Sequence, residues 1–229
     1  MKKNVSIIIA ATAPIGWLLI GIAVIMLFAG WAAIRELLLF MIVVSAASLA
    51  HAIWLAFFVP ELAAQRSSIH ANTKTWERPL LLIYMSNKLI LGPMAIGLDL
   101  GQIHLSQPSV VLQIAAIPPY LLALVLIFWS MKCNPYFELT ARIQAERNQQ
   151  VVTNGPYRFI RHPGYLGMAI QSLTTPIMAR SMLALAVSIS SVAVIVIRTS
   201  LEDRMLKNEL AGYLEYAKRT KSRLVPWIW

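Results

Sequence analysis

The residues with the clearest chemical potential lie in one window, residues 154–167, which is rich in turn formers, aromatic side chains and bases. Gly155 and Pro156 predict a turn. Pro163 suits the first position of a helix, because its missing N–H costs nothing there. Free N–H groups at the start of that helix would attract an anion. Arg161 and His162 directly precede the proline, so the window predicts an anion-binding site.

Gly164 and Gly167 follow in the same window. Without side chains, they would let a ligand approach the helix backbone. The alternative is a basic loop at a membrane edge, whose arginines reach towards the headgroups. That alternative does not account for His162-Pro163 together with the glycine spacing, so we favour a binding site.

A second window, residues 198–203, carries a basic and two acidic side chains at the end of an apolar stretch. Arg198 precedes Glu202 by one helical turn, so the two share a helix face. Adjacent acids such as Glu202 and Asp203 are costly near a membrane unless they are paired or bind a ligand. Taken alone, this window would favour a surface salt bridge with Arg204 or Lys207.

Other chemical signals are weak. His51, His70 and His104 lie far apart in no metal-ligand spacing, so we expect no metal site. Cys133 is the only cysteine and cannot form an intrachain disulfide. The chain has no Walker or Rossmann glycine pattern.

The composition indicates a membrane protein. Of 229 residues, 58% are hydrophobic and 13% charged, whereas soluble domains are roughly half apolar and a quarter charged. Seven Lys/Arg against four Asp/Glu give residues 1–131 a charge of +3, and thirteen against six give residues 132–229 a charge of +7. The bases do not alternate with aromatics on a polar face, so we expect no nucleic-acid partner and favour anionic membrane lipids.

The elements that must position these residues are membrane helices, each needing roughly 20 apolar residues to span a bilayer. Four such stretches precede the first window, at about residues 7–31, 37–59, 80–100 and 110–131. Lys88 with Gly92-Pro93 interrupts the third stretch, and Pro118-Pro119 predicts a kink in the fourth.

Two shorter apolar stretches follow, at about residues 165–177 and 182–197. We expect a helical hairpin in the bilayer, because short hydrophobic segments often mark a site at membrane depth. Apolar residues spaced by three and four over residues 202–216 predict an amphipathic helix at the interface. The predicted fold is an all-α integral membrane protein, with transmembrane region 1–131 and catalytic region 132–229 forming one domain.

The loop charges predict the orientation. Bases precede the first stretch and occupy residues 61–79, whereas residues 99–109 contain no Lys or Arg. We therefore expect the N-terminus and residues 132–161 on the cytoplasmic side of a bacterial or archaeal plasma membrane.

Residues 155–167 resemble the Arg-His-Pro-x-Tyr-x-Gly signature of the isoprenylcysteine carboxyl methyltransferase and phospholipid methyltransferase family. The resemblance covers roughly residues 130–229. Its second element is an arginine, an acidic pair, a leucine and a later tyrosine run, here Arg198, Glu202, Asp203, Leu206, Tyr213, Tyr216 and Arg219. The family usually has glutamate at the position of Asp203.

This resemblance implies S-adenosylmethionine as methyl donor, bound between the last membrane helices and the C-terminal tail. The implied cofactor-binding residues are Tyr157, Arg161, His162, Pro163, Tyr165, Gly167, Glu202 and Asp203. Bases would suit the cofactor carboxylate, Glu202 its ammonium or ribose hydroxyls, and the tyrosines its adenine or sulfonium. Arg142 and Arg198 resemble the arginines that hold a substrate carboxylate. The acceptor would be a lipophilic or small molecule carrying a carboxylate, amine or thiol.

Two other functions stay open. Sterol and steroid reductases that use NADPH have a similar Arg-His-Pro-x-Tyr-x-Gly element, but they usually place an acid where this chain has Met168. That difference favours methyl transfer. The third alternative is a non-catalytic membrane protein, against which the intact Arg-His-Pro element and Glu202 both argue.

Overall fold

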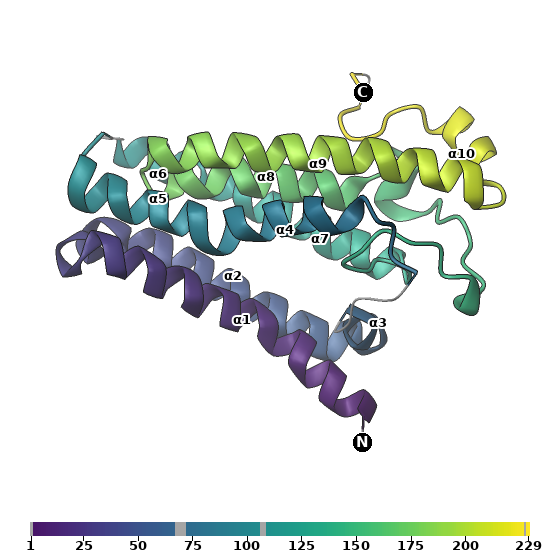
Figure 1. The fold of residues 1–229 in the computed structure, drawn as a ribbon, viewed down its shortest axis with the longest axis horizontal. Coiled ribbons are helices and arrows are strands. Elements are labelled where there is room, and N and C mark those ends of the chain that lie inside the picture. The colour runs from purple at the N-terminus through teal and green to yellow at the C-terminus, as the bar shows by residue number, and fades with distance from the viewer. Residues whose placement is uncertain (1, 67–71, 106–108, 227) are drawn as a thin grey trace.

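The computed structural model describes residues 2–66, 72–105, 109–226 and 228–229, and these residues form a bundle of helices (Figure 1). Within this described part of the chain, five helices are long and apolar enough to cross a membrane, and they run over Ile7–Ala29, Ile34–Phe58, Glu77–Ile103, Val110–Cys133 and Met182–Glu209. The predicted all-α integral membrane class is therefore confirmed, including four spans before the hairpin.

The α-helices are α1 (Lys2–Ala29), α2 (Ile34–Phe58), α3 (Pro60–Arg66), α4 (Glu77–Ser86), α5 (Gly92–Leu98), α6 (Val110–Ala115), α7 (Ile117–Cys133), α8 (Pro163–Met178), α9 (Met182–Glu209) and α10 (Tyr213–Arg219). Wider π-helical turns continue the third span at η2 (Asn87–Leu91) and η3 (Asp99–Ile103). Short 3-10 turns lie at η1 (Trp31–Ala33), η4 (Ala145–Arg147) and η5 (Gly155–Arg158).

The predicted interruption of the third span is the π-helical turn η2. Gly92 donates its backbone N–H to the carbonyl of Asn87, five residues earlier instead of four. A Cβ on Gly92 would lie 2.7 Å from that same oxygen, so only glycine fits. Pro93 then takes one of the first positions of α5, where a missing N–H is tolerated.

The fourth span breaks as its prolines predict. Helix α6 begins at the capping side chain of Ser109, whose Oγ accepts a hydrogen bond from the Val111 N–H, and it ends at Ala115. Helix α7 begins at Ile117, so Pro118 and Pro119 lie in its first turn, where prolines are tolerated.

The predicted hairpin is present, with α8 packed against α9. Helix α8 begins at Pro163 as expected. Arg180 turns the chain between the helices with φ of 58°. The buried Asp99 carboxylate accepts hydrogen bonds from Ser181 Oγ (2.8 Å) and the Leu183 N–H (3.1 Å), which ties the start of α9 to the third span.

The tail differs from its prediction. Residues 202–216 are not one amphipathic helix, because α9 continues unbroken from Met182 to Glu209 and a separate short α10 follows Gly212. The polar side chains of Arg198 and Asp203 are buried and paired instead of facing an interface, so the helix does not end where its sequence becomes polar. Gly212, with φ of 80°, makes the turn into α10.

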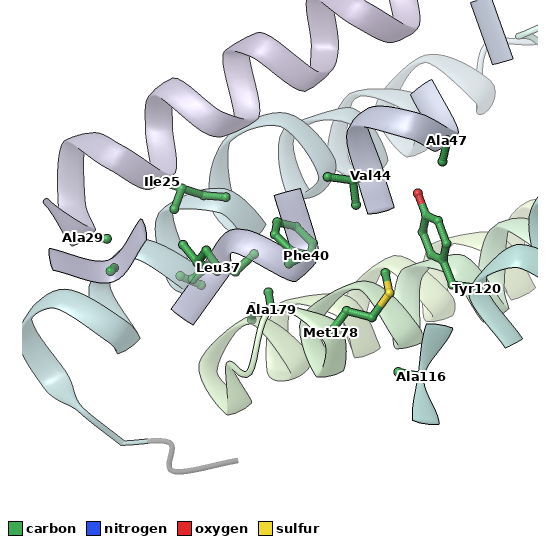
Figure 2. Packing of buried hydrophobic residues seen from close by; sticks show 14 of the residues in the cluster. Ile25, Ala29, Leu37, Phe40, Val44, Ala47, Ala116, Tyr120, Met178 and Ala179 are labelled. Carbon is green, nitrogen blue, oxygen red and sulfur yellow. The ribbon is translucent and has the colours of Figure 1, made fainter. Parts of the chain in front are cut away.

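Small residues are frequent in the core. Ala29, Ala47 and Ala179 lie among larger side chains such as Leu37 and Tyr120 (Figure 2). Small residues let membrane helices approach closely. The resulting van der Waals packing stabilises the bundle, because the hydrophobic effect does not drive helices together within lipid. A Cβ on Gly167 of α8 would lie 2.8 Å from the Ala123 carbonyl of α7, so these two helices meet at that glycine.

One end of the bundle carries α3, the start of α4, the end of α7, α10 and the irregular segment 134–162 (Figure 1). We call this the site end. Helices α1 and α2 form a hairpin that crosses the other spans at an angle (Figure 1).

Candidate functional site

A pocket at the site end collects most of the predicted site residues. It lies between segment 134–162, the start of α8, the last turns of α9 and helix α10, and it encloses about 790 Å³ including the part open to solvent. Its lining includes Arg142, Tyr157, Arg161, His162, Tyr165 and Glu202. The predicted site residues that do not line it are Pro163, Gly167, Arg198 and Asp203.

Asp203 is the centre of a buried ion cluster beneath this pocket. Its side chain is 1% exposed, and its Oδ1 lies 2.7 Å from Arg161 Nε. Tyr213 donates a hydrogen bond to the same oxygen at 3.1 Å, and Lys207 lies 2.9 Å from Oδ2. Buried charges are retained only when they are paired and hydrogen-bonded, and Asp203 fulfils both conditions through protein groups.

Arg161 connects three parts of the chain. Besides Asp203 of α9, its Nη1 donates to the carbonyls of Thr220 and Lys221, both at 2.7 Å. The Arg161 backbone N–H also donates to the Ser222 carbonyl at 3.0 Å. Arg161 therefore fastens segment 134–162 to α9 and to the tail, which leaves it little capacity to hold a ligand.

His162 and Tyr165 form an aromatic wall of the pocket. Their rings are stacked with centroids 5.7 Å apart and an angle of 7°. His162 Nε2 lies 3.5 Å from Asp203 Oδ1, and the His162 N–H donates to the Arg223 carbonyl at 2.9 Å. The ion cluster therefore orients the histidine ring, and the ring supports the face of Tyr165.

Glu202 points into the pocket on the face of α9 adjoining Asp203. The Tyr165 hydroxyl donates a hydrogen bond to Glu202 Oε2. Among the described residues, that tyrosine is the hydrogen-bond partner of Glu202, which keeps a carboxylate oxygen for a ligand. An ionised carboxylate in this position suits a cation or a sugar hydroxyl.

Tyr157 lines the inner part of the same pocket. Asn134 Nδ2 donates to its hydroxyl at 3.1 Å, and Tyr216 donates to its backbone carbonyl at 2.7 Å. Burial raises the pKa of the Tyr157 phenol, so the hydroxyl stays protonated. Gly155 makes the preceding turn with φ of 55°, and its missing side chain leaves room for Cys133.

Residues 137–142 separate this pocket from the membrane interior, and we call them the partition segment. Glu138, Thr140, Ala141 and Arg142 line the site pocket on one side. Leu139 lines a second cavity, described below, on the other. Two hydrogen bonds hold the partition segment. The Lys74 backbone N–H donates to the Ala141 carbonyl (3.1 Å), and the hydroxyls of Thr73 and Thr140 bond to each other (3.1 Å).

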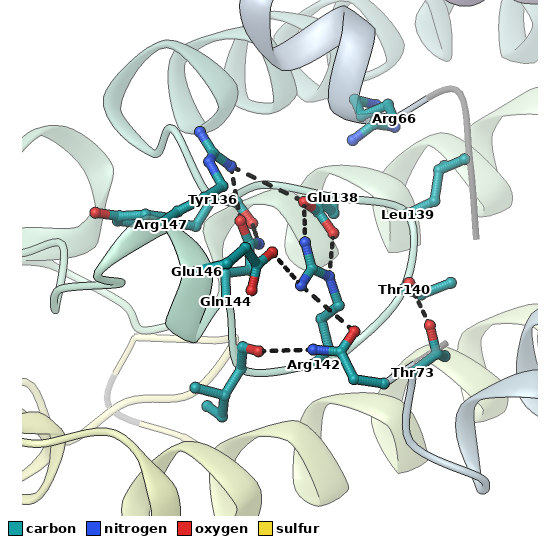
Figure 3. Close-up of polar contacts among 12 residues, drawn as sticks. Arg66, Thr73, Tyr136, Glu138, Leu139, Thr140, Arg142, Gln144, Glu146 and Arg147 are labelled. Atoms are coloured by element: carbon teal, nitrogen blue, oxygen red, sulfur yellow. Dashed lines mark hydrogen bonds and ion pairs between the residues drawn. The ribbon is translucent and has the colours of Figure 1, made fainter. Parts of the chain in front are cut away.

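The two arginines expected to hold a substrate carboxylate are both paired within the protein. Arg142 lies between Glu138 (2.8 Å) and Glu146 (2.6 Å), as Figure 3 shows. These carboxylates raise the pKa of the Arg142 guanidinium, Glu138 more than Glu146. Arg198 is buried against Glu77 of α4, donates to the Leu139 carbonyl at 2.6 Å and lies 5.1 Å from the Tyr165 ring. Arg142 lines the site pocket and Arg198 lines neither cavity, so the two arginines do not face one cavity together.

Arg66 is a site residue that no motif in the sequence indicates. Its Nη1 donates to the Phe137 carbonyl at 3.1 Å, and its guanidinium lies 5.4 Å from the Phe137 ring. Burial and the charge of Arg198 lower the pKa of Arg66 to about 10, which still leaves a cation at neutral pH. In the sequence, Arg66 belongs to the basic stretch 61–79, which predicts only the orientation of the chain in the membrane.

A larger cavity extends from the partition segment into the membrane half of the bundle. It encloses about 1,610 Å³ including its open part, and its walls come from α1, α2, α4, α5, α7, α8 and α9. Most of the lining is apolar, with Arg66 at the end next to the partition segment. We call it the membrane cavity.

Phe137 lines both the site pocket and the membrane cavity. Its ring fills the space that a side chain on Gly164 would need, because a Cβ there would lie 2.3 Å from the ring. The space beside Gly164 is therefore filled by Phe137, and the space beside Gly167 is filled by α7. The two cavities are neighbours across one aromatic side chain.

Comparison with known proteins relates this chain to one family and to a curated relative. Residues 114–208 match the isoprenylcysteine carboxyl methyltransferase (ICMT) family. A relative is the cobalt-zinc-cadmium resistance protein CzcN of Cupriavidus metallidurans, 39% identical over 83 residues. That match covers 34% of this chain and 37% of the relative, so it spans little more than a third of the relative's length.

Proposed function

Residues 114–208 belong to the isoprenylcysteine carboxyl methyltransferase family, and from this premise we propose an S-adenosylmethionine-dependent enzyme whose acceptor lies in the membrane. The match to this family supports a membrane methyltransferase of this type, and members of the family use S-adenosylmethionine. The observation that carries the proposal is Phe137, whose side chain lines both the pocket at the site end and the membrane cavity.

The site pocket fits the cofactor in size and chemistry. Small-molecule sites typically enclose ~300–1,000 Å³, and this one encloses about 790 Å³ with its open part. Glu202 has a carboxylate oxygen for the cofactor's ammonium or ribose hydroxyls. The Tyr165 ring, stacked on His162, and the Tyr157 ring offer faces for adenine or the sulfonium.

When bound, S-adenosylmethionine supplies a methyl group on a sulfonium that is already activated for transfer. The residues of this chain must then align acceptor and methyl and exclude water, which contributes up to ~7–11 kcal/mol in ideal cases. Arg198, paired with Glu77, binds the Leu139 carbonyl of the partition segment, and Arg142 pairs with Glu138 within it. These two arginines act as positioning residues, since contact with the acceptor would require them to exchange their glutamate partners.

The acceptor occupies the membrane cavity, with its reacting group next to Phe137. Arg66 is the cation at that end, and a guanidinium suits a carboxylate or phosphate better than an amine. Its Nη1 already donates to the Phe137 carbonyl, so an anion bound by its remaining N–H groups would be held close to the partition segment. A lipophilic acceptor could enter this cavity without leaving the bilayer.

The cytoplasm is the compartment that we propose for the site end. The N-terminus and residues 132–161 lie at one end of the bundle (Figure 1), and the bases in its loops favour the cytoplasmic side by their charge. This orientation would open the site pocket to the cellular supply of cofactor. We further propose a bacterial or archaeal plasma membrane as the location.

Calorimetric titration of the detergent-purified protein with S-adenosylhomocysteine, and in parallel with NADPH, tests the proposed function. We expect binding of S-adenosylhomocysteine and none of NADPH. The family match favours this outcome over the reductase alternative. Binding of NADPH alone would overturn the proposal in favour of a reductase, and binding of neither would favour a non-catalytic protein.

A further inference from the structure

The membrane cavity is electropositive, although most of its lining is apolar. Arg66 and Lys88 line it, and no aspartate or glutamate does so among the described residues. His51 of α2 belongs to the same lining and lies within electrostatic range of both cations. A cavity built only for a hydrocarbon chain would need none of these three side chains.

Lys88 lies near the middle of the third span, Glu77–Ile103, and its side chain is exposed where it lines the cavity. It follows Glu77, the first residue of α4, by three helical turns, which places it about 16 Å along the span at ~1.5 Å per residue. It belongs to the π-helical turn η2, and such turns are frequent at functional sites. A charged side chain at this depth is costly and is a functional candidate by default.

The lysine has weak compensation within the protein. Its ammonium lies 5.6 Å from the ring centroid of Trp17 on α1. No carboxylate in the described part of the chain forms an ion pair with it. A cation–π contact supplies attraction but no hydrogen-bond acceptor for the three ammonium N–H groups.

His51 gives an independent sign of a missing ligand. Its Nε2 is buried and has no hydrogen-bond partner among the described residues. The ring is held against Phe128, with centroids 5.2 Å apart. A buried polar atom without a partner costs free energy unless a ligand or water satisfies it.

We propose that Lys88 and His51 form a second polar subsite in the membrane cavity, which binds an anionic, oxygen-bearing group carried on the chain of the acceptor. The ammonium would pair with this group, and His51 Nε2–H would donate to it. The inference rests on the proposed function only in assigning the cavity to the methyl acceptor.

The subsite narrows the class of acceptor. A plain hydrocarbon chain would run past Lys88 and His51 and leave both unsatisfied. An amphiphile with a second anionic group on its chain would meet Arg66 near the partition segment and Lys88 near the middle of the third span. The acceptor is therefore a long molecule with two polar positions instead of one.

The test compares dodecanedioate with dodecanoate, which differ only in the second carboxylate. Binding of each to the full chain in neutral maltoside micelles is measured by calorimetry. We expect the dicarboxylate to bind about tenfold tighter or more, because a charge-assisted hydrogen bond is worth at least that factor. Equal affinities for the two compounds would overturn the proposal.

Substitutions test whether Lys88 and His51 cause the preference for dodecanedioate over dodecanoate. Lys88→Met and His51→Phe should each reduce it, while Lys88→Arg should keep it because the charge remains. Lys132→Met, at the exposed end of α7 outside the cavity, is the matched control and should behave as wild type. A preference that survives in both Lys88→Met and His51→Phe would contradict the subsite.

The same samples separate this inference from the proposed function. S-adenosylhomocysteine should bind equally to wild type and Lys88→Met, because Lys88 does not line the site pocket. If the wild-type protein does not bind S-adenosylhomocysteine, the cofactor assignment is contradicted. The preference for the dicarboxylate would still decide whether the subsite exists.

Discussion

Buried charges at the site end are paired with partners that come from distant parts of the chain. Arg198 of α9 meets Glu77 of α4, and Arg161 meets Asp203. Such pairs contribute little net stability when intact, because desolvation offsets attraction, but they are costly to break on one side. Their role here is to fix the partition segment and the tail against the membrane helices.

Removing Arg198 should therefore destabilise the protein strongly. Arg198→Met leaves Glu77 buried without its partner, and we expect a loss of about 3–5 kcal/mol in the free energy of unfolding. The double variant Arg198→Met/Glu77→Leu should recover much of it, because no lone charge remains. Chemical unfolding in detergent measures both.

The exposed pair Lys74–Glu209 is the matched control for this prediction. Both side chains are partly exposed, at 32% and 42%, and exposed pairs contribute about 0–1 kcal/mol. Lys74→Met should thus change stability by less than a third of the Arg198→Met effect. Similar losses in the two single variants would show that burial of the Arg198–Glu77 pair is unimportant.

The elements that carry the site depend on close helix contacts and on the docking of the tail. Helices α7 and α8 meet at Gly167, and α10 is fastened to α9 through Tyr213 and Asp203. These contacts place the start of α8 and the end of α9 on two sides of one pocket. Gly167 and Asp203 do not line the pocket themselves, so each contact can be altered without replacing a lining residue.

Gly167→Leu should disrupt the α7–α8 contact. A Cβ at this position already lies 2.7 Å from Ile127 Cγ1 and 2.8 Å from the Ala123 carbonyl, so a leucine must push the helices apart. Overpacking costs about 1–3 kcal/mol or more, which should lower the melting midpoint in detergent. Gly16→Leu is the control, because nothing lies within 4 Å of a Cβ there. An equal effect of both substitutions would contradict this account of the packing.

Asp203→Asn should release the tail. The amide cannot satisfy Arg161, Lys207 and Tyr213 together, so α10 loses the buried charge that holds it. We expect amide hydrogens of α10 to exchange at least about tenfold faster, corresponding to ~1.4 kcal/mol, by mass spectrometry. Glu209→Gln, near the same end of α9 but exposed, should leave exchange in α10 unchanged, and protection that persists in Asp203→Asn would refute the role of the ion cluster.

The spans were predictable from sequence because each is a long apolar run, and breaks follow from Gly92-Pro93 and Pro118-Pro119. The end of α9 was not predictable, because Arg198 and Asp203 are polar residues that are buried through pairing with partners distant in the sequence. The pocket lining around Tyr157, His162 and Glu202 was anticipated from two windows. Arg66 and Glu77 were not, because their contacts join positions more than 70 residues apart.

At the scale of the whole molecule, we propose that residues 1–131 and 132–229 work as one domain. Arg198 pairs with Glu77, and Thr73 and Lys74 hold the partition segment, so the N-terminal spans shape the site as well as anchoring it. The site pocket is lined by residues of 132–229, the membrane cavity takes its walls from both regions, and Phe137 lines both. This arrangement would bring a water-soluble donor and a lipid-phase acceptor together across Phe137.

The most direct test of the central claim, that the cofactor occupies the site pocket, is the dissociation constant of S-adenosylhomocysteine in Glu202→Gln. The substitution keeps the shape but removes the charge, and we expect about tenfold weaker binding or more, as for loss of a charge-assisted hydrogen bond. Glu215→Gln, exposed on α10 and paired with Lys218, is the control and should bind as wild type. Equal affinities in the two variants, measured by calorimetry on folded protein, would contradict the placement of the cofactor against Glu202.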